Sequence, residues 1–185
     1  METFNYLSVL LSIVIGLAIA QVLQGLRGLI LARVKVRLYL PTVIWTGIAL
    51  LLAIQAWWAS FGLHTRANWT FLTFIVIVLQ AISVYMVAAL VLPDVTEDAV
   101  DLRDHYFTHR SWFFGAVLAT IIFSAAKELV LRGHLPGRIN GKFHVIFSLL
   151  TIAAAITRRE WFHKLLAPAV ALLLLLYIAL LYSRL

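Results

Sequence analysis

The chain has 185 residues, of which 63% are hydrophobic and 12% charged, and its mean hydropathy is +0.99. Soluble domains carry about twice this share of charged residues, so composition alone excludes an ordinary water-soluble fold. The absence of cysteine excludes disulfides, thiolate metal sites and cysteine nucleophiles, and the net charge of +7 fits basic loops beside anionic lipid headgroups rather than a nucleic-acid partner.

Long runs without charge follow one another along the chain, and each is an expected membrane-spanning helix. A helix needs about 20 residues to cross the ~30 Å hydrocarbon core. We predict one integral membrane domain over 1–185, an all-α, polytopic transmembrane helix bundle of about six spans with short connections. The predicted spans are 4–27, 39–63, 69–92, 110–131, 142–157 and 164–184.

The first span carries small or polar residues at every fourth position, including Ser12, Gly16 and Ala20. This spacing lets a neighbouring helix backbone approach closely. Each step of four advances about 40° around a helix of 3.6 residues per turn, so only about three consecutive members can face one partner. We predict that this small-residue ladder packs within the protomer or against a second copy, and we expect self-association; a pore-lining face is the alternative.

Polar side chains recur in or near the first three spans, as Gln24, Gln55, Gln80 and Ser83. An amide without a partner is costly in hydrocarbon, so these residues should point into the bundle. Hydrogen bonding between helices is the simplest role, and a polar passage or small-molecule pocket is the alternative. The hydroxyl residues able to contribute to such a pocket are Thr73, Thr120, Ser124, Ser148 and Thr151.

The connection before the fourth span is acidic and contains histidines. In a helix, Asp101, His105 and His109 fall at i, i+4 and i+8 on one side, and the expected topology puts His163 on the same side of the membrane. Imidazole and carboxylate groups so placed can bind one divalent metal ion. The alternative is the amphipathic start of the fourth helix, whose acids favour the positive end of the helix dipole.

The fourth span ends near two adjacent charges, Lys127 and Glu128. Adjacent helical residues point about 100° apart, so they do not form a ready-made pair. Either both reach the membrane edge, or a buried Glu128 carries protons within the membrane.

The fifth run is short, because only the 15 positions 143–157 separate Lys142 from Arg158. A crossing then requires that charged side chains at both ends extend to the interface, or that the bilayer thins locally. We predict a crossing; a re-entrant segment, leaving five spans, is the alternative.

Orientation follows from the distribution of Lys and Arg beside the spans, since cytoplasmic loops carry the excess. Nine Lys and Arg residues lie on one side of the membrane, and five, or six with Lys127, lie on the other. We therefore expect both termini outside, in a membrane of the bacterial inner-membrane type. The nine are Arg27, Arg33, Lys35, Arg37, Arg103, Arg110, Arg158, Arg159 and Lys164.

The sequence carries no catalytic signature, so permeation or transport of a small solute or ion through the bundle is the leading functional hypothesis. A metal-dependent membrane enzyme that uses the cytoplasmic His/Asp cluster is the second. A non-catalytic sensor or partner subunit is the third.

Overall fold

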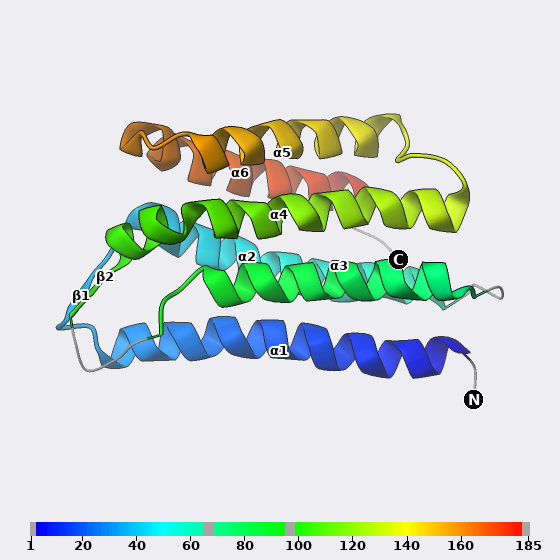
Figure 1. Cartoon of the computed structure of the whole chain (residues 1–185), viewed down its shortest axis with the longest axis horizontal. Helices are drawn as coiled ribbons and strands as arrows, with labels where there is room; N and C mark the ends of the chain where they lie inside the picture. Colours follow the sequence, from blue (N-terminus) through cyan, green and yellow to red (C-terminus); the bar gives the residue numbers. More distant parts are fainter. Residues whose placement is uncertain (1–2, 65–68, 95–98, 183–185) are drawn as a thin grey trace.

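The computed structural model describes residues 3–64, 69–94 and 99–182, with side chains from Tyr6 onward. Within these ranges, six helices are long and apolar enough to cross a membrane, and they lie side by side along one axis (Figure 1). The chain is therefore an integral membrane protein with the predicted all-α bundle. The helices are α1 (Thr3–Leu31), α2 (Leu40–Ser60), α3 (Phe71–Leu90), α4 (Leu102–Arg132), α5 (Arg138–Ile156) and α6 (Glu160–Leu181).

The predicted boundaries differ most at the last three helices. Helix α4 begins at Leu102, eight residues before the predicted span, because Asp101 caps it by accepting hydrogen bonds from the backbone N–H groups of Arg103 and Asp104. Helix α5 begins at Arg138 and has 19 residues, so it is long enough to cross despite its short uncharged run.

Two short strands connect loops that are distant in sequence. Strand β1 (Val36–Arg37) lies between α1 and α2, and strand β2 (Val100–Asp101) directly precedes α4. The two strands pair in parallel. Figure 1 shows this pair at one end of the bundle, which we call the strand end; α1 begins and α6 ends at the opposite end. A 3₁₀ turn, η1 (Phe61–Leu63), follows α2 directly.

Helix α1 packs through its larger side chains and not through the predicted ladder. Its buried stripe repeats at three- and four-residue intervals, at Leu7, Leu11, Ile15, Ala18 and Val22. This face buries more apolar surface than small residues can, and α1 packs against α2 and α3.

The predicted ladder lies elsewhere on α1. Ser12 and Gly16 are exposed, and a Cβ atom at Gly16 would meet none of the described residues within 4 Å. Ala20 is half-buried. The prediction of ladder packing within the protomer is therefore wrong, and contact with a second copy stays a prediction. The close approach of α1 is at Gly25, where an added Cβ would lie 2.8 Å from Cδ1 of Leu92.

Helices α4 and α5 form an antiparallel pair that is fixed near both ends. Near the strand end, the buried Arg110 donates from Nε to the carbonyl oxygen of Ala155 at 3.1 Å, in the last turn of α5. At the other end, Asn140 donates from Nδ2 to Oε1 of Glu128 at 2.8 Å. A positively charged group at the carboxyl end of a helix also interacts favourably with the helix dipole. The two contacts set the register in which α4 and α5 side chains meet.

Candidate intramembrane binding site

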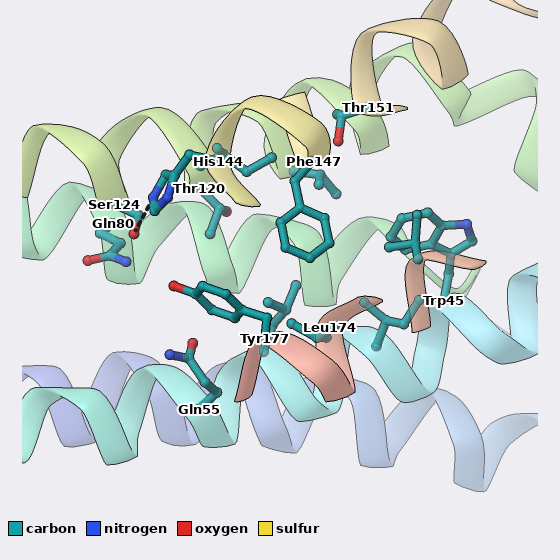
Figure 2. Close-up of a pocket in the computed structure, with 15 residues that line it drawn as sticks. Trp45, Gln55, Gln80, Thr120, Ser124, His144, Phe147, Thr151, Leu174 and Tyr177 are labelled. Atoms are coloured by element: carbon teal, nitrogen blue, oxygen red, sulfur yellow. Dashed lines mark hydrogen bonds between the residues drawn. The ribbon is translucent and has the colours of Figure 1, made fainter. Parts of the chain in front are cut away.

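A cavity of about 90 Å³ lies inside the bundle, between residues of α2, α3, α4, α5 and α6 (Figure 2). Most of its wall is apolar, with side chains such as Trp45, Phe147 and Leu174. The polar side chains that reach it come from all five helices. They are Gln55, Gln80, Thr120, Ser124, His144, Thr151 and Tyr177.

The two glutamines of this cavity have amides without a protein partner. Within the described residues, neither Gln55 nor Gln80 forms a hydrogen bond through its side chain. The hydroxyl of Ser83 donates to Gln80 at 2.7 Å, but to the backbone oxygen and not to the amide. An amide withdrawn from water without a hydrogen bond costs about 1–3 kcal/mol in protein mutational data. Both glutamines are half-buried and line the cavity, so their amides are free to bond to water or to a polar ligand within it.

Residues predicted for a polar pocket divide into two groups. Thr120, Ser124 and Thr151 line the cavity as the pocket hypothesis expects. Gln24 does not, because it is exposed at the strand end, where it borders a separate groove that also contains Arg27 and Asp94. The remaining three, Thr73, Ser83 and Ser148, do not line the cavity; Thr73 instead donates its backbone N–H to the hydroxyl that caps α3, that of Thr70.

His144 and Ser124 form a hydrogen bond between α5 and α4 at the cavity wall. Nδ1 of His144 lies 2.9 Å from the backbone oxygen of Asn140, which can only accept, so Nδ1 carries the proton. In the neutral ring Nε2 is then an acceptor, and it lies 3.2 Å from Oγ of Ser124. The serine hydroxyl therefore donates to the histidine.

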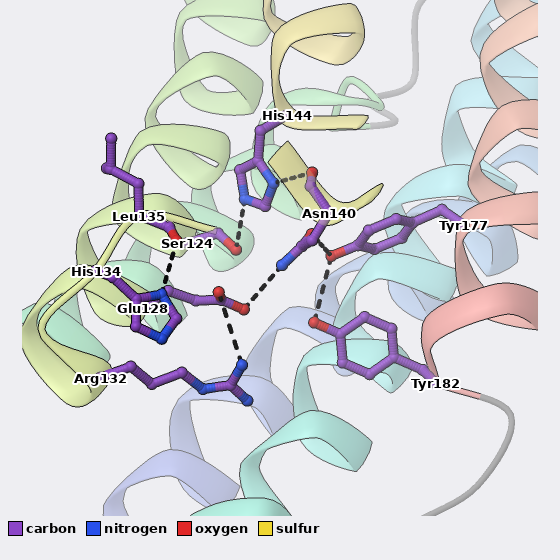
Figure 3. A network of polar contacts seen from close by, with 9 residues as sticks. All are labelled: Ser124, Glu128, Arg132, His134, Leu135, Asn140, His144, Tyr177 and Tyr182. Carbon is purple, nitrogen blue, oxygen red and sulfur yellow. Dashed lines mark hydrogen bonds and ion pairs between the residues drawn. The ribbon is translucent and has the colours of Figure 1, made fainter. Parts of the chain in front are cut away.

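A second polar network lies next to the cavity, towards the end where α6 stops (Figure 3). Asn140 is its centre: its amide donates to Glu128, and its Oδ1 accepts from the Tyr177 hydroxyl at 3.2 Å. Tyr177 also lies 3.3 Å from the hydroxyl of Tyr182. Asn140, Glu128 and Tyr182 border an open vestibule of about 440 Å³, whereas Tyr177 lines the inner cavity. The network therefore lies between the two spaces.

Glu128 is largely buried, with a side chain 13% exposed. Its Oε2 is buried with no hydrogen-bond partner in the described part of the chain, and the nearest cation is Nη1 of Arg132 at 3.9 Å. The ion pair is with Arg132, one turn away, and not with the adjacent Lys127, as helix geometry predicts. Glu128 thus faces the vestibule network and does not extend fully into water.

The residues predicted as metal ligands have separate partners. Asp101 caps α4, Nε2 of His105 lies 3.3 Å from the Leu90 oxygen, and Nδ1 of His109 lies 3.1 Å from the His105 oxygen. His163 is fully buried, between Tyr106 and the backbone oxygen of Thr157.

The rings of His105 and His109 are close, with centroids 4.5 Å apart. Across the described ranges, however, no group of three or more His, Asp or Glu side chains is placed to hold a metal ion. Binding of a divalent metal by these four residues stays a prediction without a preformed site.

Three important residues of the site were not predicted, namely Asn140, His144 and Tyr177. Asn140 and His144 are four apart, so a signal existed: they share one face of a helix that begins earlier than the charge-free run. Tyr177 lies within an almost uniformly apolar helix, where nothing in the sequence marks the direction of its hydroxyl.

Comparisons of the chain with protein-family models, with curated proteins and with solved structures give no match.

Proposed function

We propose that this protein binds a small polar solute inside the membrane and lets it pass between the inner cavity and the vestibule. The observation that carries the proposal is the pair of amides, Gln55 and Gln80, which line a mostly apolar cavity and have no side-chain hydrogen bond among the described residues. Such amides are useful only to a molecule that can hydrogen-bond to them. A wall of this kind, largely apolar with a few polar groups, is typical of small-molecule sites.

The size of the cavity limits the solute. Its volume of about 90 Å³ equals the share of roughly three water molecules in the liquid. A small neutral solute with both donor and acceptor groups fits this space and matches the amides of Gln55 and Gln80. The vestibule beyond it is wider, about 440 Å³, and opens near two arginines, Arg132 and Arg138.

The network around Asn140 is the barrier between these spaces in the proposal. Passage requires that the bond between Tyr177 and Asn140 opens, because one partner lines each space. Both partners are buried, and leaving a buried donor or acceptor unsatisfied costs about 1–3 kcal/mol, so the open form is a minor but populated state.

The proposed function also includes an orientation in the membrane and self-association. The nine basic residues of the elements that meet at the strand end support a cytoplasmic location of that end, with both termini outside, in a bacterial inner membrane with anionic headgroups beside these loops. The exposed Ser12 and Gly16 of α1 support self-association through the small-residue ladder.

Water access to the cavity is the first test, and the cysteine-free chain suits it. Gln80→Cys and Ile82→Cys place single thiols at nearly the same depth of α3, the first in the cavity and the second on the exposed apolar surface. In reconstituted protein, a water-soluble, charged methanethiosulfonate should modify Cys at position 80 and not at position 82. Equal protection of both thiols would contradict a polar passage.

Solute flux is the second test. Liposomes containing the protein should equilibrate small neutral solutes such as urea or glycerol faster than protein-free liposomes, followed by light scattering after an osmotic step. Thr151→Leu narrows the cavity and should lower the rate several-fold, whereas Ile152→Leu, on the exposed face of α5, should not. If none of the solutes tested equilibrated faster than in protein-free liposomes, permeation would be contradicted.

A further inference from the structure

We infer that Ser124 is a nucleophile activated by His144, and that the cavity accepts the acyl group of a small ester. This activity goes beyond solute passage, although it uses the same cavity. The Ser124 hydroxyl donates to Nε2 of His144 at 3.2 Å, which is the contact through which an imidazole removes a hydroxyl proton.

The base is held in the required tautomer. Nδ1–H of His144 donates to the backbone oxygen of Asn140 at 2.9 Å, so the lone pair of Nε2 points at Ser124. The same turn of α5 is fixed again through the Asn140 side chain, which bonds to Glu128 and to Tyr177. A nucleophile, a base and a group that orients the base are the three parts that this chemistry requires.

The pair is accessible to a ligand, unlike an ordinary hydrogen bond buried between two helices. Ser124 and His144 both line the cavity, and so does the free amide of Gln80 (Figure 2). In the inference, this amide is the donor that stabilises the developing oxyanion. The apolar wall and the volume of about 90 Å³ select a short apolar acyl group, whose alcohol part extends towards the vestibule.

The reaction is an ester hydrolysis in two steps. Oγ of Ser124 forms a bond to the carbonyl carbon while its proton passes to Nε2 of His144; the C–O bond of the ester then breaks, and the alcohol leaves with that proton. Water from the vestibule attacks the acyl-serine in the same way, with His144 as base. The products are a carboxylic acid and the regenerated serine.

Covalent labelling tests the nucleophile directly. Purified protein treated with an alkyl fluorophosphonate should carry one adduct, located on Ser124 by mass spectrometry of peptides. Ser124→Ala should lose the adduct and His144→Gln should lower its rate of formation at least tenfold. Ser148→Ala, which changes a serine outside the cavity, should keep the wild-type rate. An unlabelled Ser124, or labelling that His144→Gln leaves unchanged, would overturn the inference.

A thiol comparison provides a second measurement that does not depend on the probe. Ser124→Cys and Thr120→Cys place single thiols one turn apart on α4, both in the cavity. If His144 acts as a base, iodoacetamide should alkylate Cys at position 124 at least about tenfold faster than Cys at position 120, because the thiolate is the reactive form. The addition of His144→Asn should remove this advantage and leave the rate at position 120 unchanged.

The outcomes separate this inference from the proposed function. If both thiols react at equal rates, the cavity is water-accessible and Ser124 is not activated, so the inference fails alone. If neither thiol reacts, the accessible cavity is also wrong, and both fail.

Discussion

The hydroxyl of Tyr106 donates a hydrogen bond of 2.8 Å to Nδ1 of His163, and this bond joins α4 to α6 in the core near the strand end. Nε2 of His163 lies 2.9 Å from the Thr157 oxygen and must donate to it, so Nδ1 depends on Tyr106 for its proton donor. His163 is fully buried, and no water can replace Tyr106 without rearrangement. His163, which was predicted as a metal ligand, thus takes part in an interhelical contact.

We predict that Tyr106→Phe lowers the free energy of unfolding by about 1–3 kcal/mol, because it leaves the buried Nδ1 unsatisfied. The drop in melting temperature in detergent measures this. Tyr39→Phe is the matched control: its ring packs 5.5 Å from that of Tyr106, but its hydroxyl is buried with no hydrogen-bond partner in the described residues. Burial raises the pKa of Tyr39 to about 12, in agreement with an unfavourable environment for the phenolate. Removal of the Tyr39 hydroxyl should leave stability unchanged or raise it. An equal drop in melting temperature in the two variants would contradict the predicted role of Tyr106.

The Asn140 contact with Glu128 gives a double-mutant prediction. Asn140→Asp replaces the donor at 2.8 Å from Oε1 with an acceptor oxygen, so it should destabilise the protein by repulsion between two carboxylates. Glu128→Gln should restore much of this loss in the double variant, because an amide at position 128 can donate to the new aspartate. We expect a coupling energy of about 0.5–3 kcal/mol from thermal unfolding of the four proteins; additive effects would show that the two side chains do not interact.

Two glycines of α1 should respond oppositely to alanine. Gly25→Ala places Cβ 2.8 Å from Cδ1 and 3.2 Å from Cβ of the buried Leu92, so it should cost about 1–3 kcal/mol by overpacking. The added Cβ of Gly16→Ala meets no described residue within 4 Å, so this change should be neutral or stabilising, because alanine favours the helix. Thermal unfolding of both variants measures the difference, and a larger loss at Gly16 would contradict the observed packing of α1.

Gly16→Leu separates the fold from the assembly. The side chain would extend from the exposed face of α1, so the protomer should keep its stability while self-association through the ladder weakens. Size-exclusion chromatography with light scattering measures the oligomer, and an unchanged oligomer would exclude the ladder as its interface.

Reporter fusions at the two termini test the topology. We expect both reporters outside, because six crossings return the chain to its starting side and the basic residues favour the strand end inside. One reporter on each side would mean that one helix, most simply α5, does not cross.

Charge-free runs predicted the number and order of the helices, because the cost of charge in hydrocarbon acts on every span. The same signal misplaced the starts of α4 and α5, where a capping aspartate and a bonded asparagine allow polar residues to continue a helix. Of the three glutamines expected to point into the bundle, Gln55 and Gln80 line the cavity, whereas Gln24 is exposed near the strand end. The direction of the Tyr177 and His144 side chains depends on the rotation of each helix about its axis, which tertiary packing determines and local sequence does not.

The strand pair has a consequence for synthesis of the chain. Val36 pairs with Val100, and two complete crossings, α2 and α3, lie between them. In a nascent chain, β2 therefore cannot pair with β1 until α3 has been inserted and has returned the chain to the side of the membrane where β1 lies. If α3 were inserted in the reverse direction or skipped, β2 would emerge on the wrong side of the bilayer. The pair thus forms only in chains in which both α2 and α3 have crossed the membrane.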